Sequence, residues 1–393
     1  MIRVNTILSQ ELRRKRYTMA YQRPKYDANT PMEEVGMMFS AAKTKIPKIT
    51  DYPIDVRENF FLAAERNHPK WVPISTTDMQ NVGGNEVTNP PKPPAEGEAP
   101  PMMWGSKEMV DFTDDFGCVW TFVPSAGGPM LKPNHPPVVT DITKWETQVT
   151  FPDLSKNDYV AAQEYFVKNT LNPNKVTHIN IGQSCTERLV ALMGGYTQAL
   201  MAMAEEPEAV KDFLMAFADF TIKSYDNMTQ LWTPDFVTYH DDWGTERDSF
   251  FSEKMMEDIV YDPHKKIISH IKGKGRTKFE LHCCGNIKRF VPYMIDLGID
   301  FMQIQRRAND MPAFKEKWGD KIGMNVQMEG IEMRGATPPT KEALFDAIHR
   351  TVDMYAPGGG IYTSVYAADP ELQFDATMEL YYYSRELYDR ENA

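Results

Sequence analysis

The chain has few cysteines and no long hydrophobic run. Its 393 residues include 4 cysteines, too few for a disulfide scaffold of this length, and Cys283 and Cys284 are adjacent, which is poor geometry for pairing with each other. We therefore expect free thiols in a reducing cytoplasm. No apolar stretch reaches the roughly 18–20 residues of a membrane helix, and charges come too early at the N-terminus for a signal peptide. Both absences predict a cytoplasmic protein without a membrane span.

An excess of basic residues is also missing. The 43 Lys and Arg against 55 Asp and Glu give a net charge of -12. A nucleic-acid surface needs a basic face to neutralise phosphates, so this class of partner is excluded. The one basic cluster, Arg13 to Arg16, predicts a solvated helix face. The hydrophobic fraction of 42% is ordinary for a globular protein.

Short apolar segments alternate with longer amphipathic ones after Phe151. Strands are predicted at 176–181, 236–239, 278–281, 301–304, 322–326 and 361–363. Helices are predicted at 53–67, 187–203, 209–232, 251–271, 287–297 and 341–354. This alternation is typical of βαβ units in a parallel sheet. Polar residues follow several of the strands, and no glycine-rich phosphate turn follows the first, so we favour a TIM-like (β/α)8 barrel over a doubly wound sheet.

The N-terminal third predicts two additions to the barrel. Residues 1–50 are expected to form a helical extension, and residues 51–393 a single barrel domain. Six prolines fall within residues 89–101, which predicts an irregular loop over one face of the barrel.

A chelating pair follows the strand predicted at 278–281. His282 and Cys284 stand two residues apart on a turn, and Gly285 lets the backbone bend away. An imidazole and a thiolate at this spacing can bind one zinc ion, and an open catalytic site fits better than a closed structural one because four ligands are not evident. A buried cysteine pair beside a core histidine is the alternative.

Acidic residues follow the neighbouring strand. We assign His240, Asp241 and Asp242 as catalytic candidates, because acids at a strand mouth can orient a metal ligand, act as a base or contact substrate. An Asp that caps the next helix is the alternative for one of the two. Glu187 and Arg188 are expected to form an ion pair at the barrel rim.

Amide and phenol side chains end three further strands. Asn325, Gln327, Gln305 and Tyr362 are candidate substrate-binding residues, with Gln303 in the same position on its strand. Filling of the barrel mouth is an equally open interpretation of these residues.

With these residues in place, the chain resembles the uroporphyrinogen decarboxylase-like superfamily, and within it the cobamide-dependent methyltransferases. The likeness spans about residues 53–390 and rests on four segments. They are Phe-Glu-Leu-His-Cys-Cys-Gly-Asn-Ile at 279–287, Tyr-His-Asp-Asp-Trp-Gly-Thr at 239–245, Thr-Glu-Arg-Leu at 186–189 and Glu-Glu-Pro-Glu at 205–208. Our specific interpretation is the methyltransferase component of an O-demethylase.

The resemblance implies a distorted (β/α)8 barrel that holds Zn2+ through the His and Cys of His-x-Cys and a later Cys. His282 and Cys284 match the first two, but segment 361–367, where the later Cys would lie, contains none. The candidates to replace it are Tyr366, Glu280, Asp241 and His240.

The resemblance also implies the reaction. We expect methyl transfer from a methylated small molecule, with an aryl methyl ether favoured, to the Co(I) corrinoid of a partner protein, and a homodimer as the candidate assembly. The alternatives are a methylcobamide:thiol methyltransferase of the coenzyme M type, a decarboxylase, and a non-catalytic corrinoid-binding or small-molecule-binding barrel. The missing third Cys counts against the thiol enzyme. The decarboxylases' arginine-rich N-terminal segment ending in Gly-Arg is absent as well.

Overall fold

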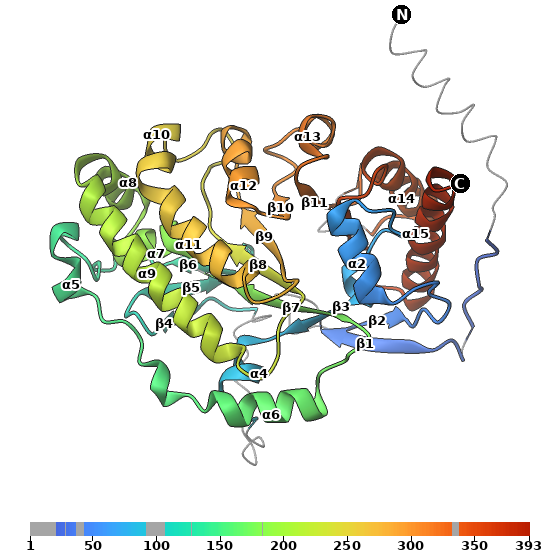
Figure 1. Ribbon diagram of the computed structural model, residues 1–393, viewed down its shortest axis with the longest axis horizontal. Coiled ribbons are helices and arrows are strands. Elements are labelled where there is room, and N and C mark those ends of the chain that lie inside the picture. The colour runs from blue at the N-terminus through green and yellow to red at the C-terminus, as the bar shows by residue number, and fades with distance from the viewer. Residues whose placement is uncertain are drawn as a thin grey trace, which may run out of the picture.

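The computed structural model describes residues 21–27, 29–36, 43–91, 107–126, 128–182, 184–331 and 338–393. Its centre is a parallel sheet in the order β12-β11-β10-β9-β8-β7-β3 (Figure 1). The strands are β3 (Met79–Val82), β7 (Val176–Ile181), β8 (Phe236–His240), β9 (Lys278–Cys283), β10 (Phe301–Ile304), β11 (Gly323–Val326) and β12 (Ile361–Thr363). Every neighbouring pair is parallel, as the alternating pattern predicts.

The two edges of this sheet are brought together. Ile74, just before β3, forms a parallel bridge with Thr363 of β12, and the Thr363 backbone nitrogen donates to Pro73 at 3.1 Å. The sheet therefore curls into the expected TIM-like barrel. Seven strands form it in the described part of the chain, and the Pro73–Ile74 segment joins its edges.

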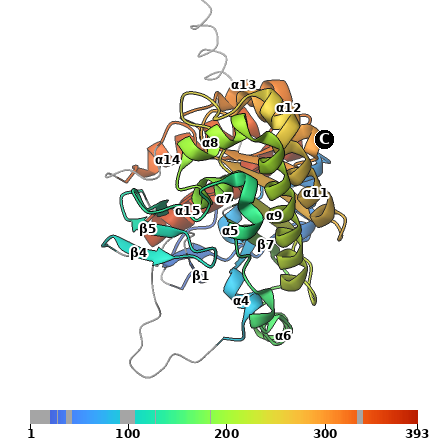
Figure 2. The same cartoon turned by 90° about the vertical axis from the view of Figure 1, so that its left-hand side faces the viewer.

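Helices surround the sheet (Figures 1 and 2). The longer ones are α2 (Val56–Glu65), α6 (Tyr159–Asn169), α7 (Cys185–Leu192), α8 (Tyr196–Glu205), α9 (Pro207–Met228), α11 (Tyr261–Lys272), α12 (Val291–Leu297), α13 (Met311–Trp318), α14 (Lys341–Tyr355) and α15 (Pro370–Glu391). Short ones are α3 (Ser75–Asp78), α4 (Gly84–Thr88), α5 (Trp145–Gln148) and α10 (Glu253–Met255). None in the described ranges is both long and apolar enough to cross a membrane.

Two predicted helices are interrupted. The helix expected at 187–203 is divided into α7 and α8 by Gly194 and Gly195, whose φ angles of 78° and 144° no helix tolerates. The helix expected at 251–271 contains a π-helical turn, Met256–Val260, between α10 and α11. α13 lies in a stretch for which the sequence predicted no helix.

The helical extension predicted for residues 1–50 is wrong where the structure describes it. Residues 1–20 lie outside the described ranges, but β1 (Met32–Gly36) and β2 (Lys43–Pro47) pair as antiparallel strands. Ile46 of β2 is fully buried, so tertiary packing, which local helix propensity does not reflect, decides this segment. Most of the proline-rich loop at 89–101 also lies outside the described residues.

A second small sheet lies beside the barrel helices (Figure 2). It consists of β4 (Val110–Thr113), β5 (Val119–Val123) and β6 (Gly128–Leu131) in antiparallel order. Asp114, in the turn after β4, forms an ion pair of 2.6 Å with Arg188 of α7. This contact holds the small sheet against the helix that follows β7.

Side chains fill the barrel in layers, as barrel geometry requires. An aromatic floor of Phe60, Phe236 and Phe301, with ring centroids 5.1–5.9 Å apart, closes the N-terminal end. The Tyr362 ring packs edge-on against this floor from the layer above. Successive inward side chains on a strand are two residues apart. The inward residues above the floor, such as Glu280 and His282 on β9, are polar. The chemistry is thereby confined to the C-terminal mouth.

Candidate metal centre

Two glycines bring the turns after β8 and β9 into contact. Gly285 has a φ of 85°, and a Cβ at this position would lie 2.1 Å from the carbonyl oxygen of Gly244. The backbone nitrogen of Asn286 donates to the Thr245 carbonyl at 2.6 Å. Such an approach of two backbones is available only to glycine. Asp242, two residues before Gly244, and Cys284, just before Gly285, are consequently neighbours.

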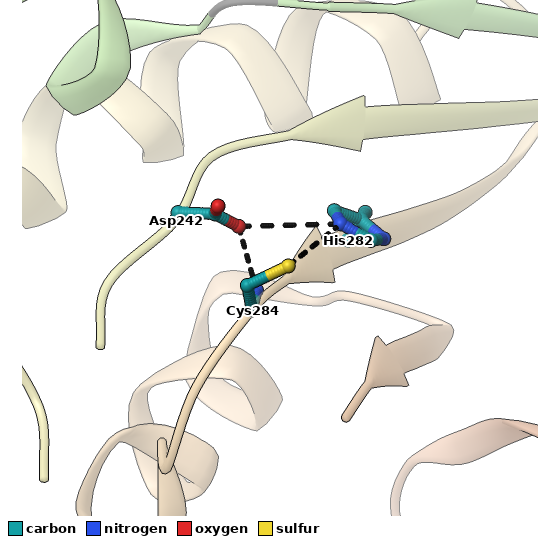
Figure 3. Close-up of side chains that lie close together, drawn as sticks. All are labelled: Asp242, His282 and Cys284. Carbon is teal, nitrogen blue, oxygen red and sulfur yellow. Dashed lines mark hydrogen bonds and ion pairs between the residues drawn. The ribbon is translucent and has the colours of Figure 1, made fainter. Parts of the chain in front are cut away.

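Asp242, His282 and Cys284 converge at the barrel mouth (Figure 3). Cys284 Sγ lies 3.4 Å from His282 Nε2, and Asp242 Oδ1 lies 4.0 Å from the same nitrogen. One candidate ligand atom from each residue lies within 4.8 Å of the other two. All three side chains are partly exposed, so a bound ion would be reachable from the mouth.

The three donors fit a zinc ion. Bonds of about 2.0–2.3 Å in a tetrahedron place ligand atoms roughly 3.3–3.8 Å apart, close to the two distances above. Nδ1 of His282 lies 2.5 Å from Gln303 Oε1, which occupies that nitrogen and leaves Nε2 for a metal. Burial and the Asp242 carboxylate raise the pKa of Cys284 to about 12. A cation is the group that would let this carboxylate and a thiolate coexist here.

Glu187 extends the acidic side of this cluster. Its side chain hydrogen-bonds Asp242, and burial together with the Asp242 and Asp241 carboxylates raises the pKa of Glu187 well above its usual range. Arg188 forms an ion pair with Asp114 at 2.6 Å, and its charge also acts to lower the pKa of Glu187, so the Glu187–Arg188 ion pair stays a prediction.

Asp241 and His240 lie beside the cluster but do not complete it. Asp241 is fully buried and accepts hydrogen bonds from Thr186 Oγ1 at 2.7 Å and Trp243 Nε1 at 2.8 Å. It also pairs with His264 of α11 at 2.8 Å, so it anchors the turn to the surrounding helices. The His240 ring lies 4.6 Å from that of His282, and burial, with His282 next, lowers the pKa of His240 to about 3.

Glu280 was a candidate metal ligand and Tyr362 a candidate substrate contact. Both lie one layer deeper in the barrel than His282. Glu280 is fully buried and accepts a hydrogen bond from the Tyr362 hydroxyl at 2.7 Å. Tyr362 in turn accepts from Asn325 Nδ2 at 2.7 Å. Burial raises the pKa of Glu280 to about 7. These residues form the polar layer beneath the cluster and do not belong to it.

Of the remaining candidates, one hydrogen-bonds the turn that carries Cys284, and the other two form no hydrogen bond with the cluster in the described part of the chain. Gln305 Oε1 accepts from the backbone nitrogen of Gly285 at 3.0 Å and so holds the turn that carries Cys284. Gln327 is exposed near the end of β11. Tyr366 is partly buried, and the structure gives it no hydrogen bond to Asp242, His282 or Cys284 among the described residues.

Sequence reasoning missed Asp242 as a candidate ligand and Gln303 as a partner of His282. Strand register carries the signal for Gln303, which lies directly beside His282 across β9 and β10. Asp242 follows His240, which pairs with His282 across β8 and β9, so an acid two residues on could have been compared with Cys284. Asp242 and Cys284 each stand two residues after one member of the His240–His282 pair, and this equal spacing was the signal in the sequence.

Comparison with known proteins places this architecture in a family. The family model described as uroporphyrinogen decarboxylase (URO-D) matches residues 109–364, more than half of the chain. No curated protein matches. Among solved structures, a methyltransferase from Methanosarcina mazei has 14% identity and a TM-score of 0.56, over 86% of this chain and 100% of that one.

Two glycosidases show a weaker likeness that carries no argument. An endo-1,4-beta-xylanase from Caldicellulosiruptor owensensis has 12% identity and a TM-score of 0.25 over 53% of this chain and 69% of its own. A beta-glucosidase from Pyrococcus furiosus has 11% identity and a TM-score of 0.32 over 86% of each chain. The family match and the curled parallel sheet agree, and the chain belongs to the uroporphyrinogen decarboxylase (URO-D) family.

Proposed function

We propose that this chain moves a methyl group from a methylated small molecule, with an aryl methyl ether favoured, to the Co(I) corrinoid of a partner protein. The observation that carries the proposal is the convergence of His282, Cys284 and Asp242 at the barrel mouth. Three protein ligands with one open position are typical of catalytic zinc. A fold shared with a protein named as a methyltransferase supports the same reaction class.

The donor set favours an ether over a thiol as the methylated substrate. An ether is a poor methyl donor because its departing alkoxide or phenoxide is a strong base. Zinc held by these three residues would supply a Lewis acid for that oxygen. Asp242 stands where a second thiolate would make the donor set softer and more electron-rich. This chain therefore provides a site suited to activating an oxygen.

An aromatic pair beside the cluster supports an aryl substrate. The rings of Tyr196 and Phe250 lie 4.5 Å apart, and Tyr196 is 42% exposed. Burial raises the pKa of Tyr196, and the charges of Asp242, Glu187 and Cys284 contribute, which supports a position of the ring near the candidate ligands. A flat apolar surface there would stack on an aryl ring and orient its methoxy group.

The test uses zinc-loaded protein, Co(I) cobalamin and a panel of methoxylated aromatics, methanol and methylamines. We expect methylcobalamin to form with at least one aryl methyl ether, and not with His282→Ala. His349→Ala, remote from the site on α14, is the matched control and should keep the activity. If every donor leaves Co(I) unmethylated while zinc is stoichiometric, the proposal is wrong. Demethylation of methylcobalamin by an added thiol would instead favour the thiol enzyme. The cytoplasmic location and the homodimer stay predictions.

A further inference from the structure

Glu280 lies directly beneath His282 on β9, one inward side chain deeper in the barrel. It is fully buried, and its Oε1 accepts from Thr238 Oγ1 at 2.9 Å and Gln303 Nε2 at 3.1 Å. Its Oε2 accepts from the Tyr362 hydroxyl at 2.7 Å. Strand register explains these contacts, because Thr238 pairs with Glu280 and Gln303 pairs with His282 across the sheet. Each of these three neighbours thus donates to the carboxylate.

The contact with Asn325 fixes the direction of the hydrogen bond between Tyr362 and Glu280. Asn325 Nδ2 lies 2.7 Å from the Tyr362 oxygen, and an amide nitrogen can only donate. The hydroxyl hydrogen of Tyr362 must therefore point at Glu280. The polar layer is ordered so that Glu280 is its common acceptor.

The Gln303 amide bridges Glu280 and His282. Its Nε2 donates to Glu280, and its Oε1 lies 2.5 Å from Nδ1 of His282. Glu280 accepts from Thr238 on Oε1 and from Tyr362 on Oε2, and the amide nitrogen of Gln303 faces it as a third donor. The reversed amide would set two oxygens against each other and leave buried acceptors unsatisfied. With its oxygen toward His282, Gln303 requires a hydrogen on Nδ1.

A hydrogen on Nδ1 decides which nitrogen of His282 can bind a metal. In the neutral ring the lone pair is then on Nε2, the atom that lies 3.4 Å from Cys284 Sγ. We propose that Glu280, acting through Gln303, selects the His282 tautomer that binds metal, which makes both residues positioning residues for the centre. The inference rests on the metal site of the proposed function and is independent of the methyl donor.

The test measures metal affinity and the tautomer separately, above neutral pH. Zinc affinity of the metal-free protein is obtained by competition with a chromophoric chelator, and the tautomer from 15N spectra of histidine-labelled protein. Glu280→Gln introduces an amide that can donate, so Gln303 is free to reverse. We expect zinc affinity to fall about 10–100-fold and the His282 signal to move toward the form with hydrogen on Nε2.

A charge exchange and a matched control complete the design. In Glu280→Gln/Gln303→Glu the amide at 280 donates to the carboxylate at 303, which accepts from Nδ1, so zinc affinity should recover to within a few-fold of wild type. Asp78→Asn changes another fully buried carboxylate, whose partners include Tyr52 and Trp71. This variant should lose stability without a change of tautomer.

Three results would overturn the relay. They are a wild-type His282 with hydrogen on Nε2, a Glu280→Gln variant with wild-type zinc affinity, and an exchange variant with no recovery. If Glu280→Gln fails to fold, the partly exposed Gln303→Leu tests the same step and should give the same two changes. The tautomer is measured without metal, so a wild type that binds no zinc but has hydrogen on Nδ1 would contradict the proposed function alone.

Discussion

Asp242 accepts a hydrogen bond of 2.6 Å from the backbone nitrogen of Cys284. This bond fastens the turn after β8 to the turn after β9 at the point where their side chains converge. It also turns a carboxylate toward a thiol and an imidazole, and no Lys or Arg in the described ranges forms a salt bridge with this carboxylate. We propose Asp242 as the ligand that takes the place of the later cysteine implied by the resemblance.

Asp242→Asn separates the charge of this residue from its hydrogen bond. The amide oxygen can still accept from Cys284, so the turn should keep its shape, but the anionic ligand is lost. Zinc affinity should fall by more than about 100-fold, because loss of a direct ligand costs more than loss of an outer partner, which costs 10–100-fold. Chelator competition measures it. Asp248→Asn, on the same loop and exposed, is the control, and equal affinity in the two variants would exclude Asp242 as a ligand.

Gly285→Ala should separate the two turns. Its Cβ would lie 2.1 Å from Gly244, in addition to the strain of a φ of 85°. Gly298 has a nearly equal φ of 82° but no atom within 4 Å of a Cβ. Gly298→Ala should therefore lose about 1–2 kcal/mol of unfolding free energy from backbone strain alone. Gly285→Ala should lose more and should also lose zinc. Equal stability of the two variants in urea titrations would show that the backbone contact is unimportant.

Asp241→Asn should affect stability more than metal binding. Asp241 and His264 form a fully buried pair, and breaking such a pair costs about 3–5 kcal/mol. Urea unfolding of the metal-free protein should show this loss, while Asp242→Asn leaves stability nearly unchanged. A variant at 241 that is stable but loses zinc as strongly as the variant at 242 would make Asp241 part of the centre itself.

Glu379 on α15 should contribute an acid-sensitive part of the stability. Burial raises its pKa, but hydrogen bonds from His349 at 2.7 Å and Arg23 at 3.0 Å outweigh this and lower it below 4.5. The charged form is thus favoured in the folded state, so its contribution is present above the unfolded pKa and is lost as pH falls through the folded one. Between about pH 6 and pH 3, Glu379→Gln should lose less unfolding free energy than wild type. Identical slopes would contradict this assignment.

The sequence was sufficient for the barrel because its evidence is local and repeated. The strands at 176–181 and 361–363 have the predicted bounds, since short apolar runs between helices leave little choice. The strands at 32–36 and 43–47 were predicted as helix because local sequence does not show that β2 packs against α15, far away in sequence. No local pattern contains that information.

The candidate site could be predicted only where its ligands share one turn. His282 and Cys284 are two residues apart, so their spacing, together with the resemblance, made them candidate ligands. Asp242 is 40 residues before His282 and becomes its neighbour through β8–β9 register and through a contact between two glycines. Glu280 has the right chemistry for a ligand, but its inward position one layer lower depends on the pleat, which a sequence motif does not show.

The central claim is that His282, Cys284 and Asp242 hold one zinc ion with a single sulfur ligand. X-ray absorption at the zinc edge of the purified wild-type protein tests it most directly. The account predicts stoichiometric zinc with one sulfur at about 2.3 Å and nitrogen or oxygen ligands at about 2.0–2.2 Å. Two sulfur ligands, or a protein that retains no zinc, would contradict it.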